Sequence, residues 1–596
     1  MMNTVIQDSI FNRFFSRPSR VLWLYLCSAL AMTFPLVMHF RSALPAGSGD
    51  IWQNYWNFWW WKTSLIELQK SPYQSSYLFH PTGVDLSLHT HSPFNMIVGM
   101  PVNLLLGEAA AYNFCILLGL CLAAWGMYFL VKELTGDNRA AFLAGIVFAY
   151  FPQHIEQTLE HLNLASVQFL PFTLWFFFRT IRSSSKRNVV GLGGCFALNA
   201  LCSWHLAVIL LMLLAFVGVW ELRQEKRVRR KVLLQWVAAG VFAALLVSPA
   251  IFPMIEEMAD ESKYFLKPPV DRGIDASYLM VPPYAHPLWG EWTAATYEDR
   301  AYQSAGFMNY LGLVPLVLAV IGLRRYWKKT RLWGFVGLGS LILALGANPW
   351  WNGVLYEEIS LPFGVLTSLP VLEIFRVANR FLILTSLALA VLVGFGVSKA
   401  SYGDGKFLCV IGLVFFEYLW VPYPIRQIEI SPLYEQLADA DGGGAVLDIP
   451  FHQRNRTVQN LVAQTVHRRP IGDGYISTTP TVVESAIHAE PSLANLVRVP
   501  NLLEDIDTAQ LRKLGFEWVV LHKDRRASHR HEFLSLTKPG DILELKRVKR
   551  LGGVPDKIFD EIRRQLTMRT GPPVLEDQKV AIFYLGSVIQ PVQLPR

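Results

Sequence analysis

The chain has 596 residues, of which 52% are hydrophobic and 17% are charged, and it carries 19 tryptophans. Together with a mean hydropathy of +0.30, this composition excludes an ordinary soluble protein and predicts a polytopic membrane protein. The net charge of +8 does not require a nucleic acid partner, because basic residues concentrated in short cytoplasmic loops give the same excess. The six cysteines lie in apolar segments without metal-ligand spacing, which argues against a disulfide framework and a zinc site.

Apolar runs that could cross a bilayer core of about 30 Å recur along the chain and suggest about eleven spans. They lie near residues 21–39, 109–131, 140–151, 164–178, 189–202, 206–220, 232–254, 309–323, 332–346, 381–398 and 406–421. The first run is followed by no small-residue cleavage site, so we expect it to be retained. Ser203-Trp204-His205 interrupts residues 189–220, and basic clusters flank both ends of that stretch. Both ends therefore belong in the cytoplasm, which predicts a hairpin.

The distribution of basic residues predicts the topology. Among the loops of residues 1–421, the short inner loops hold most of the lysines and arginines, whereas the longer outer loops are poor in them. This places the N-terminus in the cytoplasm and gives an odd number of spans. We therefore expect residues 1–421 to be a transmembrane domain with extracytoplasmic loops. Residues 422–596 are expected to be a soluble extracytoplasmic domain, and strand-like patterns at 445–449, 518–521 and 579–585 with a helical pattern at 506–514 predict a mixed α/β fold.

In the first outer loop an acidic residue, Asp50, stands directly before the tryptophan-rich segment 51–62. If residues 51–68 are helical, Trp52, Trp56, Trp59 and Trp60 share one face, which predicts a helix lying in the membrane interface. An ordinary aromatic belt gives the same pattern. Asp50 is expected at the N-cap of this helix, so a capping carboxylate and a catalytic base are both open interpretations.

Further polar clusters lie in the outer loops. His89-Thr90-His91 beside Asp85 could bind a metal, although packing within the loop is the favoured interpretation. The second outer loop carries Glu156 and Glu160, which would share a helix face, followed by His161. Polar groups at a membrane boundary are candidates for function, and an interfacial helix is the alternative.

Two arginines, Arg376 and Arg380, stand four residues apart before a late span. They could clamp a lipid phosphate through forked hydrogen bonds, or they could lie among lipid headgroups. Lys263 and Lys267 in the fourth outer loop could assist such a clamp. The histidines at 452, 467 and 488 match no metal or catalytic pattern, and we expect surface positions for them.

Three elements carry a resemblance to a known family: Gly49-Asp50-Ile51-Trp52-Gln53-Asn54, then Phe151-Pro152 with His161-Leu162-Asn163, and Phe375-Arg376 to Arg380-Phe381. In this order they resemble the GT-C superfamily of integral-membrane glycosyltransferases. The chain is most similar to its poorly characterised bacterial members, distant relatives of protein O-mannosyltransferases and lipid A aminoarabinose transferases. No second aspartate follows Asp50, and Lys62 ends the tryptophan run, whereas oligosaccharyltransferases carry a Trp-Trp-Asp motif in their soluble domain. These departures argue against an asparagine acceptor and leave a divalent metal open, with no ligands assigned.

The resemblance implies transfer of a sugar from a polyprenyl-phosphate donor to a glycan, lipid or protein acceptor, on the outer face of a bacterial inner (plasma) membrane during envelope assembly. It implies Asp50 as general base. Glu156, Glu160 and His161 of the second outer loop are further catalytic candidates. Arg376, Arg380, Lys263 and Lys267 would stabilise the departing lipid phosphate. A lipid-linked sugar flippase or transporter is an alternative, but it should bury charges near mid-bilayer, and the spans are nearly free of charge. A non-catalytic envelope assembly protein is the other alternative.

Overall fold

The computed structural model describes residues 14–586 apart from 48, 225–228, 259–272, 294–295, 297–307, 370–371, 373–374, 376, 399–402, 453–457, 498–506 and 523–555. Each of the apolar runs predicted from the sequence contains a helix. These are α2 (Pro18–Met32), α5 (Glu108–Thr135), α6 (Asn138–Ala149), α9 (Phe169–Arg182), α10 (Lys186–Cys202), α11 (Trp204–Gln224), α12 (Arg229–Met258), α14 (Leu313–Arg325), α15 (Trp327–Ala344), α17 (Leu382–Val397) and α18 (Asp404–Glu417).

Within the described residues, five helical segments are both long and apolar enough to cross a membrane alone, namely Glu108–Thr135, Leu162–Arg182, Trp204–Gln224, Arg230–Met258 and Ala378–Val397. The protein is therefore a helical membrane protein, while a count of eleven spans stays a prediction. The first run is shorter than predicted, because α2 ends at Met32 and Pro35, which has no N–H, follows. Residues 36–39 form a separate 3₁₀ turn.

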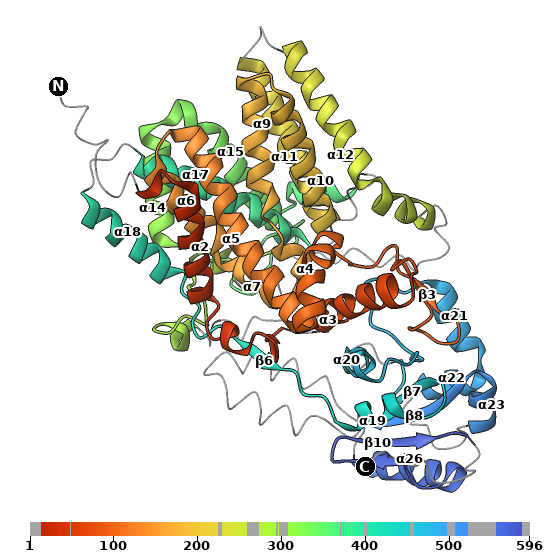
Figure 1. The fold of residues 1–596 in the computed structure, drawn as a ribbon. Coiled ribbons are helices and arrows are strands. Elements are labelled where there is room, and N and C mark those ends of the chain that lie inside the picture. Colours follow the sequence, from red (N-terminus) through yellow and green to blue (C-terminus); the bar gives the residue numbers. More distant parts are fainter. Residues whose placement is uncertain are drawn as a thin grey trace, which may run out of the picture.

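The interrupted stretch at 189–220 forms two helices, as predicted. Ser203 has extended backbone angles (φ −161°, ψ 120°), which end α10, and α11 begins at the next residue. Helix α10 packs between α9 and α12, as Figure 1 shows. Apolar side chains of α12 face away from this bundle, and Leu234, Val237 and Leu245 are exposed.

Helix α17 forms the centre of the bundle. All of its residues are buried, and it packs against α6, α14 and α15. Its approach to α14 depends on small residues, since a Cβ on Gly396 would lie 2.1 Å from the Leu318 carbonyl oxygen and one on Gly322 would lie 2.3 Å from the Leu392 carbonyl oxygen. Glycines at such contacts let helix backbones pack closely in membranes. The remaining elements of the membrane half are α4 (Pro93–Leu106), α7 (Pro152–Glu160), α8 (Leu162–Ala165), α16 (Pro362–Thr367), β2 (Gln74–Ser75), β3 (Val84–Asp85), β4 (Trp350–Trp351) and β5 (Val354–Leu355).

The C-terminal region contains a mixed sheet in the order β7-β8-β10-β9. Strands β7 (Ala445–Ile449) and β8 (Phe516–His522) are parallel, whereas β10 (Val580–Tyr584) is antiparallel to β8 and to β9 (Leu575–Glu576). The strands predicted from the sequence are confirmed at β7, β8 and β10. The accompanying helices are α19 (Leu433–Asp439), α20 (Val458–His467), α21 (Thr481–Ala489), α22 (Pro491–Val497), α23 (Thr508–Lys513) and α26 (Asp556–Thr570).

The C-terminal region returns to the start of the first outer loop. Strand β6 (Ile425–Gln427) pairs with β1 (Ala43–Pro45), so that Ala43 lies opposite Gln427. Directly after β1 comes helix α3 (Gly49–Lys62), which lies between the membrane helices and α20 (Figure 1). Residues far apart in the sequence are thereby brought together around α3.

The expectation that the tryptophan face of α3 meets lipid is wrong. Trp56, Trp59 and Trp60 are only 1%, 2% and 2% exposed, because α20 and residues 71–91 cover them in place of lipid. The Trp56 indole N–H donates to Gln464 Oε1 at 2.7 Å, and that of Trp60 donates to the Pro72 carbonyl at 2.9 Å. Such partners are what a buried indole requires. The aromatic face of α3 is therefore protein core.

Candidate functional site

Asp50 lies inside α3, one residue after its start, and not at the predicted N-cap position. Its carboxylate is bound by two side chains. The Tyr475 hydroxyl donates to Asp50 Oδ1 at 2.7 Å, and His161 Nε2 lies 3.2 Å from Asp50 Oδ2. The side chains of Asp50 and His161 are 38% and 34% exposed, so a substrate can still reach the pair.

Two glycines allow this arrangement. A Cβ on Gly47 would lie 1.9 Å from the Leu159 carbonyl oxygen near the end of α7, and a Cβ on Gly49 would lie 3.0 Å from the Tyr475 hydroxyl. The chain entering α3 therefore touches the end of α7 on one side and the C-terminal region on the other. His161 is the residue that directly follows α7, which places its ring against Asp50.

The electrostatics of the pair favour its charged form. Burial raises the pKa of Asp50, but the hydrogen bond and charge of His161 and the hydrogen bond from Tyr475 outweigh burial, so the pKa is lowered. Burial lowers the pKa of His161, but its hydrogen bond to Asp50 and the negative charges of Glu160 and Asp50 raise it above the ordinary value. Asp50 is therefore ionised at neutral pH.

Arg380 lies on the 3₁₀ turn Ala378–Phe381, and its positive charge is close enough to lower the pKa of His161. The structure thus brings together Asp50, Glu160, His161 and Arg380 from three separate parts of the sequence. Glu156 lies one turn earlier on α7 and is not among the groups that shift the pKa of Asp50 or His161. The other predicted phosphate ligands, Lys263, Lys267 and Arg376, lie outside the described residues.

The His89 and His91 side chains pack within the loop, as the favoured interpretation expected. His91 Nδ1 accepts from the Trp61 indole at 3.1 Å, and its Nε2 donates to the Leu86 carbonyl at 3.0 Å. His89 Nε2 lies 2.9 Å from Asn57 Oδ1. Burial lowers the pKa of both rings, that of His91 to about 3. Across the part of the chain that the structure describes, no cluster of three His, Cys, Asp or Glu side chains could hold a metal ion.

Of the three histidines at 452, 467 and 488, the expectation of a surface position holds for His488 alone. His467 is 3% exposed. The ring of His452 lies between Asp473 Oδ1 at 3.1 Å and Glu484 Oε2 at 3.0 Å. Both were mispredicted because loop spacing does not reveal which residues the fold buries.

Tyr475, which lies 425 positions from Asp50, was not predicted from the sequence. The only local signal is its neighbourhood, Gly472-Asp473-Gly474, which is typical of a turn and points to no partner.

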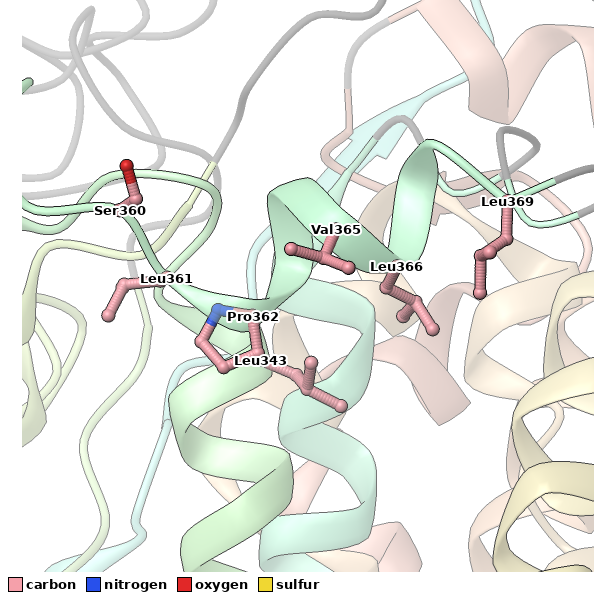
Figure 2. Close-up of a pocket in the computed structure, with 7 residues that line it drawn as sticks. All are labelled: Leu343, Ser360, Leu361, Pro362, Val365, Leu366 and Leu369. Carbon is pink, nitrogen blue, oxygen red and sulfur yellow. The ribbon is translucent and has the colours of Figure 1, made fainter.

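An apolar groove lies apart from this site, at the end of α15 and along α16. Figure 2 shows its lining, formed by Leu343, Ser360, Leu361, Pro362, Val365, Leu366 and Leu369. None of these side chains is titratable, so the groove contributes no acid or base. The polar cluster around Asp50 is the candidate active site.

Comparison with known proteins gives a family and a fold. A family model described as a domain of unknown function (DUF6311) matches residues 22–416. No curated protein matches the sequence. The solved arabinofuranosyltransferase AftD from Mycobacteria is similar with a TM-score of 0.55 and 15% identity over 87% of this chain and 35% of AftD. The chain thus spans about a third of the length of AftD.

Two further solved structures show weaker similarity. The oligosaccharyltransferase AglB from Archaeoglobus fulgidus, in complex with an inhibitory peptide and a dolichol-phosphate, gives a TM-score of 0.49 at 13% identity, over 86% of this chain and 70% of AglB. ArnT from Cupriavidus metallidurans, bound to undecaprenyl phosphate, gives 0.41 at 11% identity, over 96% of this chain and 98% of ArnT. The similarity to AftD confirms the GT-C resemblance at the level of the fold.

Proposed function

The chain belongs to the DUF6311 family, and we propose that it is a membrane glycosyltransferase that uses a polyprenyl-phosphate sugar as donor. The sugar would pass to a glycan, lipid or protein acceptor on the extracytoplasmic face of the inner membrane. One observation carries the proposal. On a GT-C fold, an accessible carboxylate, Asp50, is paired with His161 and lies near the cationic Arg380.

In the proposed reaction, the acceptor hydroxyl or amine attacks the anomeric carbon while the bond from that carbon to the phosphate oxygen breaks. The lipid phosphate leaves with the bonding electrons, and Asp50 takes the proton of the acceptor. A carboxylate with a lowered pKa is a weak base. It suffices when the transition state resembles an oxocarbenium ion, because the acceptor proton becomes acidic only as the new bond forms.

The departing phosphate requires positive charge at the same place. Arg380 supplies it in the described part of the site, and its guanidinium can form two parallel hydrogen bonds to a phosphate. Arg376, Lys263 and Lys267 are proposed to assist. His161 would hold the Asp50 carboxylate, and Glu160 would keep His161 protonated through its negative charge.

The proposed topology places residues 1–421 in the membrane with eleven spans and a cytoplasmic N-terminus, and residues 422–596 outside the cytoplasm. The arrangement of the helices supports it. In Figure 1 the end of α11 and the start of α12 lie at the opposite end of the bundle from α3 and the C-terminal region. These helix ends border the most basic predicted inner loop, as expected for a cytoplasmic surface.

The test is sugar transfer by the purified full-length protein and its Asp50→Asn variant. Donors would be undecaprenyl-phosphate-linked pentoses and hexoses, the acceptor would be a membrane extract, and the readout would be free undecaprenyl phosphate. Loss of a positioned base costs on the order of 100-fold to 10,000-fold in rate. Asparagine has nearly the same shape and still accepts from Tyr475, so the thermal midpoint should change little.

Asp85→Asn is the matched control, because Asp85 lies in the same outer loop and bonds the backbone N–H of Ser87. It should leave transfer unchanged. Unimpaired transfer by Asp50→Asn would refute Asp50 as the base and direct attention to Glu160 and then Glu156. A wild-type protein that releases no lipid phosphate from any donor would favour the non-catalytic assembly protein.

A further inference from the structure

We infer that the C-terminal region completes the active site, with Tyr475 as a positioning residue that orients the Asp50 carboxylate when residues 473–477 dock on α3. The inference rests on the proposed function. The Tyr475 hydroxyl donates to Asp50 Oδ1 at 2.7 Å, on the opposite carboxylate oxygen from His161. Two donors on different oxygens fix the rotation of the carboxylate. Each oxygen retains a lone pair that can receive the acceptor proton.

Further hydrogen bonds involving Ser477 of the C-terminal region lie along one face of α3. Gln53 Nε2 donates to Ser477 Oγ at 3.3 Å. The Ser477 backbone N–H donates to His89 Nδ1 at 3.3 Å, and His89 Nε2 in turn lies 2.9 Å from Asn57 Oδ1. Residues 50, 53 and 57 share one helix face by their spacing. The segment therefore binds a stripe of α3 that begins with the proposed base.

The first outer loop also forms backbone hydrogen bonds to Ile471, just before residues 473–477. The Ile471 N–H donates to the Tyr77 carbonyl at 2.9 Å, and the His80 N–H donates to the Ile471 carbonyl at 3.0 Å. Thr90 Oγ1 lies 2.7 Å from Ser477 Oγ. A Cβ on Gly474 would lie 2.8 Å from the Phe79 ring, so glycine is required for this close approach.

Ionisable side chains of the C-terminal region hold residues 473–477 in place. Asp473 is 2% exposed, and its Oδ1 accepts from the Gly474 N–H at 2.8 Å and lies 3.1 Å from His452 Nδ1. Glu484 holds the other ring nitrogen of His452. Tyr475 is thus presented by a segment anchored on two sides, which is what precise placement of a catalytic group requires.

The test compares Tyr475→Phe with Tyr584→Phe in the full-length protein. The first variant loses only the hydroxyl on Asp50. The second makes the same change in β10, where the ring packs on Trp518 and not on α3. One hydrogen bond to a charged group supports a loss in kcat on the order of 10-fold to 100-fold for Tyr475→Phe. KM for the donor should stay unchanged, and the acid limb of the pH profile should move to higher pH, because the ionised carboxylate loses a donor. Tyr584→Phe should change none of these.

Hydrogen exchange of the first two turns of α3, measured on the same variants, does not depend on turnover. Faster exchange in Tyr475→Phe than in Tyr584→Phe supports the docking contact. Equal exchange in the two variants overturns the inference, as does a Tyr475→Phe protein with wild-type kcat and an unmoved acid limb. If the wild-type protein transfers no sugar but exchange is still faster in Tyr475→Phe than in Tyr584→Phe, the proposed function is refuted and the contact is established.

Discussion

Two histidine–carboxylate pairs in this protein differ mainly in burial. In the first, His161 Nε2 lies 3.2 Å from Asp50, and the side chains are 34% and 38% exposed. In the second, His522 Nε2 lies 2.7 Å from Asp448 Oδ1 between neighbouring strands, with exposures of 9% and 2%. Water weakens the electrostatic attraction within the first pair, but a substrate can reach its side chains. Burial strengthens the attraction within the second pair and keeps a substrate away from it. The same two types of side chain therefore form part of the candidate site in one place and of the protein core in the other.

The cluster of His452 with Asp473 and Glu484 lies between these extremes. Burial lowers the pKa of His452, but hydrogen bonds and charge from both carboxylates outweigh it and raise the pKa to about 9. His452 is 16% exposed, so no large ligand can approach it, yet its protonation can still respond to pH. Its partner Asp473 belongs to the segment that presents Tyr475.

The largest expected effect is on the buried pair. Asp448→Ala removes the partner of a buried histidine, and breaking such a pair costs about 3–5 kcal/mol. Asp50→Ala should cost about 1 kcal/mol or less, because exposed pairs contribute little. Hydrogen exchange of β7 and β8 in Asp448→Ala, and of α3 in Asp50→Ala, would measure both. Asp439→Ala at the exposed end of α19 is the control. Equal destabilisation at the two sites would contradict the distinction drawn from burial.

An intermediate effect is expected from His452→Gln. A raised histidine pKa stabilises the fold fully below the unfolded value near 6.5, and the stabilisation is lost as pH rises through about 9. The wild-type C-terminal region should therefore lose roughly 2 kcal/mol over this window, after allowance for solvent screening. Exchange of β7 and β8 between pH 6 and pH 10 measures the loss, and His488→Gln provides an exposed control. The prediction fails if His452→Gln keeps the wild-type slope with pH.

The smallest effect concerns His161→Gln, which removes the positive charge from the exposed pair. Because His161 lowers the pKa of Asp50, the substitution should raise that pKa and move the acid limb of kcat/KM to higher pH. The loss at neutral pH should be about fivefold, roughly 1 kcal/mol. A pH profile of transfer, with His39→Gln as control, checks the result. An unmoved acid limb would show that His161 does not act on the base.

Local patterns in the sequence were sufficient for most helices and strands, and they singled out four residues that the structure brings together at the candidate site. Glu160 and His161 directly precede one apolar helical segment, and Arg380 lies at the start of another. Asp50 directly precedes the tryptophan-rich run. Polar residues are conspicuous at such places. The partner Tyr475 was not predictable, because a contact across 425 positions leaves no periodic signal. The tryptophans of α3 were misplaced for a related reason. The sequence pattern of an aromatic helix face is the same whether lipid or protein packs against it. The sequence of α20 does not indicate that this helix packs on α3.

The stacking of Trp56 on Trp60 has an optical consequence. Their ring centroids are 5.6 Å apart with an interplanar angle of 10°, and Gln464 of the C-terminal region holds the Trp56 indole. Two indoles at this separation couple their electronic transitions and give a paired signal in circular dichroism. Any motion that draws α20 away from α3 would separate the rings or admit water beside them. The circular dichroism signal of this tryptophan pair thus reports whether α20 of the C-terminal region is docked on α3.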